Sequence, residues 1–113
     1  MYAIEIVRFT VKKGAEQAML AERPAMVRAI RLRHPIYMDA YLARLDDGSW
    51  VDLVIWADRA QAESITEDIH LDSDIAKWFR HIDQILGSDY ADIHDINRLN
   101  IKPYGLGASN AIR

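Results

Sequence analysis

The stretch WVDLVIWA, at residues 50–57, decides the fold of this chain. Its side chains alternate between two faces. One face is wholly aliphatic, with Val51, Leu53 and Ile55, whereas the other mixes rings with a carboxylate: Trp50, Asp52, Val54 and Trp56. Such alternation, in residues of β-branched and aromatic type, predicts a β-strand. The mixed face is too apolar for open water and too polar for a plain core, so we look for function there.

Two further stretches repeat this alternation. Residues 36–45 precede residues 50–57 across an Asp-Asp-Gly-Ser turn, and an Asp-Gly pair between two alternating stretches is a strong hairpin signal. On the first of these strands, Tyr37, Asp39 and Tyr41 are predicted to share one face. Another strand is predicted at residues 2–11, where Glu5 would lie on the same face as Asp52.

Helical spacing separates these strands. Residues 15–34 repeat apolar side chains and Arg23 every three or four positions, which predicts a helix, and Pro24 within it predicts a kink or two abutting segments. After residue 57, an N-cap at Asp58 opens a helix over residues 60–68. A second helix is predicted from residue 72 or 73 until Gly87, followed by a final strand at residues 89–95.

The order β-α-β-β-α-β predicts an α+β fold, the ferredoxin-like antiparallel sheet with helices on one face. Residues 1–95 form this domain, and residues 96–113 form a C-terminal tail that packs on the domain or on a dimer partner. We expect the helices to cover the aliphatic face and leave the aromatic-acidic face free. A free apolar face usually marks an interface or a binding groove, and two-fold pairing buries it most simply. We therefore expect a homodimer whose two sheets enclose a space.

Composition excludes several classes of function. The chain has 113 residues, a net charge of -3, no basic cluster and no cysteine. These features argue against nucleic-acid binding and exclude disulfides and thiolate chemistry. No apolar run approaches the roughly 20 residues that span a bilayer, and the first residues lack the features of a signal peptide. We expect a cytoplasmic protein with no membrane partner.

The same features carry a family resemblance over residues 1–95. The element order, the proline in the first long helix, the Leu45-Asp46-Asp47-Gly48 hairpin and the step VIWAD at residues 54–58 resemble the dimeric α/β-barrel superfamily. Within it, the chain is similar to antibiotic biosynthesis monooxygenase-like domains. That resemblance implies dimerisation into an α/β barrel and a ligand cavity in each protomer. Its members include cofactor-free oxygenases of phenolic compounds, haem-degrading enzymes and isomerases.

Four polar residues are candidates for proton transfer: Glu5, Asp52, Asp92 and His94. Their strands should be neighbours, a carboxylate in a partly dry cavity has a raised pKa, and an imidazole can relay the proton. We expect His94, Asp52 and Glu5 to be catalytic and Asp92 to contact substrate. The alternative is structural: Asp52 or Glu5 pairs with Arg8, Arg44 or a partner chain, or lies at the rim of the sheet in water.

The remaining candidates would bind substrate. The resemblance makes Trp56 a wall that stacks on a flat substrate, although a core role for Trp56 stays open. If the protein is an enzyme, we expect Tyr37, Tyr41 and Tyr90 to shape the pocket with it. His70 and His81 lie in the predicted helical lid. Haem-degrading relatives use a helix histidine as iron ligand, but this chain lacks the asparagine that they carry on the first strand. No histidine pair has helical metal-site spacing, so we expect no metal and no cofactor.

Three functions remain. The first is a cofactor-independent monooxygenase or isomerase acting on a small aromatic or enolisable molecule. The second is a binding module that uses the same cavity without chemistry. The third is a dimerisation domain whose aromatic face is packed against its twin. A pocket of a few hundred Å³ beside the sheet would argue against the third function.

Overall fold

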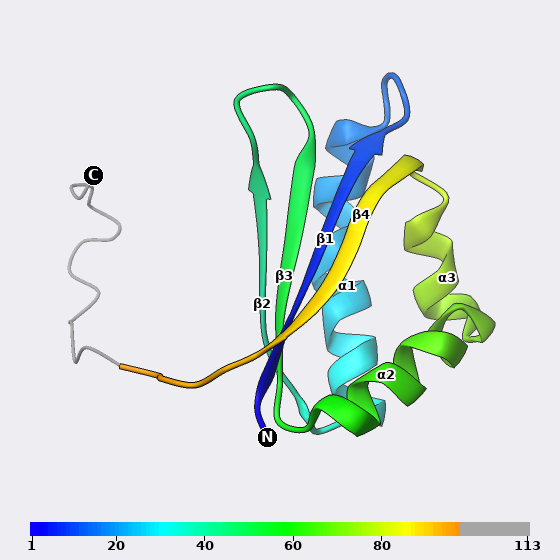
Figure 1. Cartoon of the computed structure of the whole chain (residues 1–113). Coiled ribbons are helices and arrows are strands. Elements are labelled where there is room, and N and C mark those ends of the chain that lie inside the picture. The colour runs from blue at the N-terminus through cyan, green and yellow to red at the C-terminus, as the bar shows by residue number, and fades with distance from the viewer. Residues whose placement is uncertain (98–113) are drawn as a thin grey trace, which may run out of the picture.

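The computed structural model describes residues 1–97, apart from the side chain of His70. It contains one antiparallel sheet of four strands in the order β2-β3-β1-β4. The helices gather on one side of this sheet (Figure 1). The elements are, in chain order, β1 (Ala3–Val11), α1 (Glu16–Arg33), β2 (Tyr37–Arg44), β3 (Trp50–Trp56), α2 (Arg59–Asp68), a 3₁₀ turn η1 (Ile69–Leu71), α3 (Ser73–Phe79) and β4 (Ile82–Asp92). The ferredoxin-like α+β prediction is confirmed, and the predicted tail beyond residue 97 lies outside the described residues.

Local chemistry fixes the ends of the elements. The Asp58 side chain accepts the backbone N–H of Gln61 at 3.0 Å and caps α2 as predicted, and Asp72 caps α3 in the same way. In the β2–β3 hairpin, Gly48 has a φ of 89°, which favours glycine. Helix α1 runs without interruption through Pro24, so the prediction of two abutting segments was wrong. No helix within residues 1–97 is long and apolar enough to cross a membrane.

The last strand begins earlier than predicted. Helix α3 ends at Phe79, and β4 runs over Ile82–Asp92 where the sequence predicted a helix until Gly87. The short apolar run there suits a helix and a strand equally well by spacing alone. Pairing decides between them, because β4 satisfies the hydrogen bonds of β1 along its whole length, with two register shifts near Phe9 and Val11.

The helices cover the aromatic-acidic face of the sheet, so the predicted assignment of faces was wrong. Phe9, Trp50 and Trp56 are buried beneath the helices. The residue pairs between β1 and β3 show that the other face of the sheet holds the aliphatic side chains Ile4, Ile6, Val51, Leu53 and Ile55. No helix within residues 1–97 covers this face. Aromatic rings bury about 150–250 Å² each, so covering this face removes the larger apolar area from water.

A β-bulge divides the predicted face of β2. Tyr37 pairs with Trp56, but the next pair is Asp39 with Ile55, so Met38 is an extra residue in the strand. Tyr37 therefore lies on the helix side, whereas Asp39 and Tyr41 lie on the aliphatic side. The prediction that these three residues share a face was wrong, because strict alternation along the chain does not survive a bulge.

Helix α1 provides a test of which surface is buried. Met19 is fully buried, whereas Leu32 of the same helix is 84% exposed. We expect Met19→Ala to lower the free energy of unfolding by about 2–5 kcal/mol, because it leaves a cavity in the core. Leu32→Ala should change it by less than about 0.5 kcal/mol. Urea denaturation of both variants measures this difference, and equal losses would contradict the orientation of α1.

Candidate functional site

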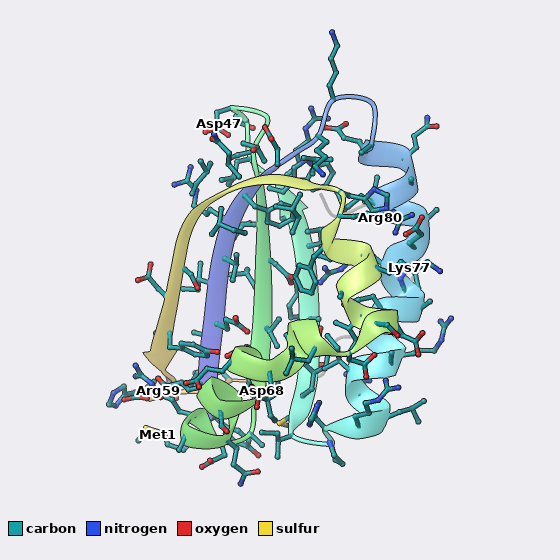
Figure 2. The ribbon with its side chains drawn as sticks, turned by 90° about the vertical axis from the view of Figure 1, so that its right-hand side faces the viewer. Met1, Asp47, Arg59, Asp68, Lys77 and Arg80 are labelled. Atoms are coloured by element: carbon teal, nitrogen blue, oxygen red, sulfur yellow. The ribbon has the colours of Figure 1, made fainter. Side chains whose placement is uncertain are left out.

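A cavity of about 240 Å³ lies between the helix side of the sheet and the helices. Figure 2, which views the molecule with α2 and α3 in front, shows side chains of the sheet and of the helices filling this layer. Most of the lining is apolar or aromatic, and its polar members are two carboxylates and two hydroxyls. It comprises Glu5, Val7, Phe9, Met26, Ile30, Tyr37, Asp52, Val54, Trp56, Thr66, Ile69, Trp78, Phe79, Ile82 and Ile85.

Glu5 is a carboxylate of this cavity with a shifted pKa. Its place on β1 directs its carboxylate to the helix side, where the indole Nε1 of Trp56 on β3 donates a hydrogen bond to it at 3.0 Å. Burial raises the pKa of Glu5 above its usual value, the Trp56 hydrogen bond opposes that rise, and the charge of Asp52 adds to it. Glu5 is therefore a stronger base than an exposed carboxylate, and a fixed donor orients it.

Asp52 is held by an ion pair from α1. The guanidinium of Arg23 binds both of its carboxylate oxygens, at 2.8 and 3.2 Å, with the two side chains only 10% and 17% exposed. The same guanidinium lies 5.5 Å from the centre of the Trp78 ring. Asp52 is thus committed to a bidentate pair, so Glu5 rather than Asp52 is the carboxylate with a free basic oxygen.

Aromatic rings form the walls. Tyr37 packs edge-on against Trp56 with ring centres 5.0 Å apart, and Phe9 packs edge-on against Trp78 at 6.1 Å. Trp78 is fixed in turn by a hydrogen bond from its Nε1 to the carbonyl oxygen of Met19 at 2.9 Å. These locked rings present edges and faces to a flat ligand.

Two hydroxyl groups complete the polar lining. Burial, and then the charge of Asp52, raise the pKa of Tyr37 above its usual value, so its phenol stays protonated at neutral pH and can donate a hydrogen bond. Thr66 of α2 and Tyr90 of β4 share a hydrogen bond at 2.6 Å that ties helix to strand beside the cavity.

The two ends of the cavity differ. Phe79 and Ile85 are the solvent-exposed members of the lining, so the cavity opens between the end of α3 and the start of β4. At the opposite end, Arg59 pairs with Asp92 at 3.1 Å and lies 5.9 Å from the Tyr90 ring centre. Figure 2 shows Arg59 close to the end of β4, far from Arg80.

Solved structures share this fold, although no family model and no curated protein matches the chain. A protein of Chloroflexus aurantiacus J-10-fl, provisionally named antibiotic biosynthesis monooxygenase, has a TM-score of 0.67 and 10% identity over 87% of this chain and 98% of its own. A protein of Bordetella bronchiseptica with the same provisional name has a TM-score of 0.61 and 16% identity over 81% and 96%. SnoaB, a cofactor-independent oxygenase from Streptomyces nogalater, has a TM-score of 0.58 and 20% identity over 88% and 98%.

The chain has the antibiotic biosynthesis monooxygenase fold. The predicted resemblance is thereby confirmed at the level of fold. Both provisionally named proteins are matched over nearly their full length.

Within this monooxygenase-type fold, the structure brings together four of the predicted site residues: Glu5, Asp52, Trp56 and Tyr37 all line the cavity. Tyr90 lies next to them through its bond to Thr66. Arg8 and Arg44, named as possible partners of the carboxylates, were wrong, because Asp52 binds Arg23 and Glu5 binds Trp56.

Four other predicted residues lie elsewhere. Tyr41 is 58% exposed on the aliphatic face, because the bulge reverses its direction. His94 is exposed beyond the end of β4, and Asp92 is occupied by Arg59, so neither joins Glu5. His81 follows α3 rather than lying within it, and its Nε2 contacts the Glu22 carboxylate at 3.0 Å, outside the cavity lining. The side chain of His70 lies outside the described residues.

The sequence interpretation missed the structural role of Arg23 and the place of Trp78 in the cavity. A signal for Arg23 was present, since it falls on the apolar stripe of α1, where a guanidinium needs a carboxylate on the opposing surface. That requirement points to the acid-bearing face of the sheet. Within the described residues, no group of three histidine or acidic side chains could hold a metal ion.

The Arg23–Asp52 pair can be tested by stability. We expect Arg23→Ala to lower the free energy of unfolding by about 3–5 kcal/mol, because it leaves the Asp52 charge uncompensated in a partly dry site. The matched control is Arg80→Ala, whose bidentate pair with Glu22 is largely exposed and should contribute less than about 1 kcal/mol. Chemical denaturation near neutral pH gives both values, and a loss for Arg23→Ala no greater than the control's would refute the buried role of the pair.

Proposed function

We propose that the protein is a cofactor-independent monooxygenase that deprotonates a small phenolic substrate in this cavity and lets the resulting anion react with O₂. One observation carries the proposal: Glu5, whose pKa burial raises, is aimed by Trp56 into a cavity walled with aromatic rings. A general base is most effective when its pKa lies near the working pH, and burial moves a carboxylate toward that range.

The reaction needs no external reductant. Glu5 takes the phenolic proton, and the electron-rich phenolate transfers an electron to O₂. A new C–O bond then forms at the ring carbon para to the oxygen. Loss of the proton from this carbon and cleavage of the O–O bond yield a carbonyl and release water. Phenol and O₂ thus give a quinone and water, and all four electrons come from the substrate.

The surroundings of Glu5 suit this chemistry. The Arg23–Asp52 pair supplies a fixed dipole beside the base, and the protonated hydroxyl of Tyr37 can donate to the oxygen that becomes negative. The apolar walls exclude water, which strengthens these interactions and protects the anion from reprotonation. SnoaB, which shares this fold, is described as a cofactor-independent oxygenase, and this similarity supports the proposal.

Other functions draw less support. A cavity of this size beside the sheet argues against a face used only as dimer packing. An isomerase would use the same proton abstraction without O₂, and a binding module would use none. For haem, a histidine facing the cavity is required, but no histidine whose side chain the structure describes lines it, and His81 binds Glu22.

We also propose that the protein forms a homodimer through the aliphatic face of the sheet. Ile4, Ile6, Val51, Leu53 and Ile55 form a continuous apolar surface on the two central strands. Burying such a surface is favourable by about 25 cal/mol per Å², and a two-fold axis lets one face cover itself. This proposal keeps the predicted dimer but moves its interface to the opposite face of the sheet.

Glu5→Gln tests the reaction. It keeps an oxygen acceptor for Trp56 but removes the base, so O₂ uptake with one- and two-ring phenols should fall by about 100- to 10,000-fold. Glu67→Gln, an exposed change on α2, should leave the rate unaltered.

In the wild type the rate should rise as pH increases through the raised pKa of Glu5, since only the carboxylate accepts a proton. Asp52→Asn removes a charge that raises this pKa and should move the rise to lower pH. Wild-type activity in Glu5→Gln would refute the proposed base.

Leu53→Asp tests the dimer. Light scattering after gel filtration should show a dimer for the wild type at micromolar concentration. The variant should be a monomer, because a charge in the apolar interface costs several kcal/mol and weakens association by about 100-fold or more. Leu32→Asp on the outer surface of α1 is the control and should remain dimeric. Circular dichroism confirms folding, and a monomeric wild type or a dimeric Leu53→Asp would contradict the proposed interface.

A further inference from the structure

We infer that the cavity selects uncharged hydroxylated aromatics of one or two fused rings and rejects carboxylate-bearing analogues of the same size. This inference rests on the proposed function, because it concerns the substrate of the same site. Three features of the cavity carry it: its volume, its walls and the sign of its charge.

The volume limits the ligand to one or two rings. An apolar protein cavity of about 150 Å³ can accommodate benzene, whereas sites for drug-sized molecules begin near 300 Å³. At about 240 Å³, the present cavity lies between these two cases. A bicyclic phenol fits such a space, whereas a four-ring phenol exceeds it and leaves part of its rings outside the mouth between α3 and β4.

The walls favour a flat ligand. The rings of Tyr37 and Trp56 meet at 79°, and those of Phe9 and Trp78 meet at the same angle, so each pair offers one face and one edge. Because hydrogen bonds fix the indoles of Trp56 and Trp78, these surfaces are preorganised. A planar aromatic ring gains stacking contacts here without ordering any wall.

The charge of the cavity excludes anions. Its charged groups are carboxylates, Glu5 and Asp52, and no lysine, arginine or histidine whose side chain the structure describes lines it. The nearby guanidinium of Arg23 is already bound to both oxygens of Asp52 and stacked on Trp78. An anionic ligand would therefore lose its hydration and meet a like charge, with no free cation among the described lining residues to compensate.

A hydroxyl group meets the opposite situation. A phenolic O–H can donate to the Glu5 carboxylate, and hydrogen bonds to a charged acceptor are about twice as strong as neutral ones. The ligand hydroxyl thus makes a polar contact with Glu5 in a cavity whose walls are otherwise mostly apolar. It also places the proton that the proposed reaction removes next to the base.

Calorimetric titration of the full chain at pH 7 without O₂ tests the inference with three ligands of similar size: 2-naphthol, 2-naphthamide and 2-naphthoate. The amide is an uncharged isostere of the carboxylate, so the ratio of their dissociation constants measures the effect of charge alone. We expect 2-naphthol to bind most tightly and 2-naphthoate to bind about 100-fold more weakly than 2-naphthamide. The four-ring 1-hydroxypyrene should bind at least tenfold more weakly than 2-naphthol.

Variants locate the selectivity. Glu5→Gln should narrow the gap between 2-naphthamide and 2-naphthoate by at least tenfold, whereas Asp83→Asn, an exposed change outside the lining, should leave it unchanged. The wild-type ratio is decisive even if Glu5→Gln fails to fold. Equal binding of amide and carboxylate, tight binding of 1-hydroxypyrene, or binding of none of the ligands would overturn the inference.

Failure of the reaction is distinguishable from failure of this selectivity. Binding of 2-naphthol with the expected preferences but no O₂ uptake in air would overturn the proposed oxygenase and leave the selectivity standing. Turnover confined to anionic or four-ring phenols would overturn the selectivity and leave the oxygenase standing.

Discussion

The bidentate pair between Arg23 and Asp52 is the constraint on which the rest of the structure depends. It allows the acid-bearing face of the sheet to be the covered face, because a carboxylate beneath helices needs a partner of opposite charge. Helix α1 brings that partner on its buried side, between Met19 and Met26. Once this face is covered, the large rings of the sheet become the core, and the aliphatic face is left for contact with something else.

The pair also shapes the chemistry of the cavity. Arg23 occupies both oxygens of Asp52, whereas Glu5 has one oxygen bound by the indole of Trp56 and no described side chain bonded to the other. The two carboxylates lie on neighbouring strands but have different environments, and such a difference is how a protein gives two similar groups distinct tasks. The remaining surroundings are apolar, so each polar group in the cavity has a large effect.

The sequence predicted the elements well and their surroundings poorly. Alternation identified β1, β2 and β3, and cap chemistry placed the start of α2 at Asp58, because these signals are local. Which face the helices cover is a tertiary property, and two apolar faces give no local signal to separate them. The bulge at Met38 is likewise invisible, since one inserted residue reverses every later side chain without changing the pattern.

The site residues were likewise predicted correctly where local patterns placed them and wrongly where tertiary pairing did. Glu5, Asp52 and Trp56 lie on β1 and β3, whose register follows from simple alternation, so the sequence grouped them correctly. The predicted positions of His94 and His81 depended on where β4 and α3 begin and end. The pairing of β4 with β1 decides these boundaries. Arg23 was visible in the helical stripe, and its need for an anion would have indicated the correct face in advance.

The two central strands act as a partition one sheet thick between two compartments. Along β3, Asp52 and Val54 face the cavity while Val51, Leu53 and Ile55 face the opposite side. If a proposed ligand in the cavity changes the twist of these strands, a proposed partner on the far face meets an altered surface. Thermodynamic linkage makes any such coupling equal in both directions.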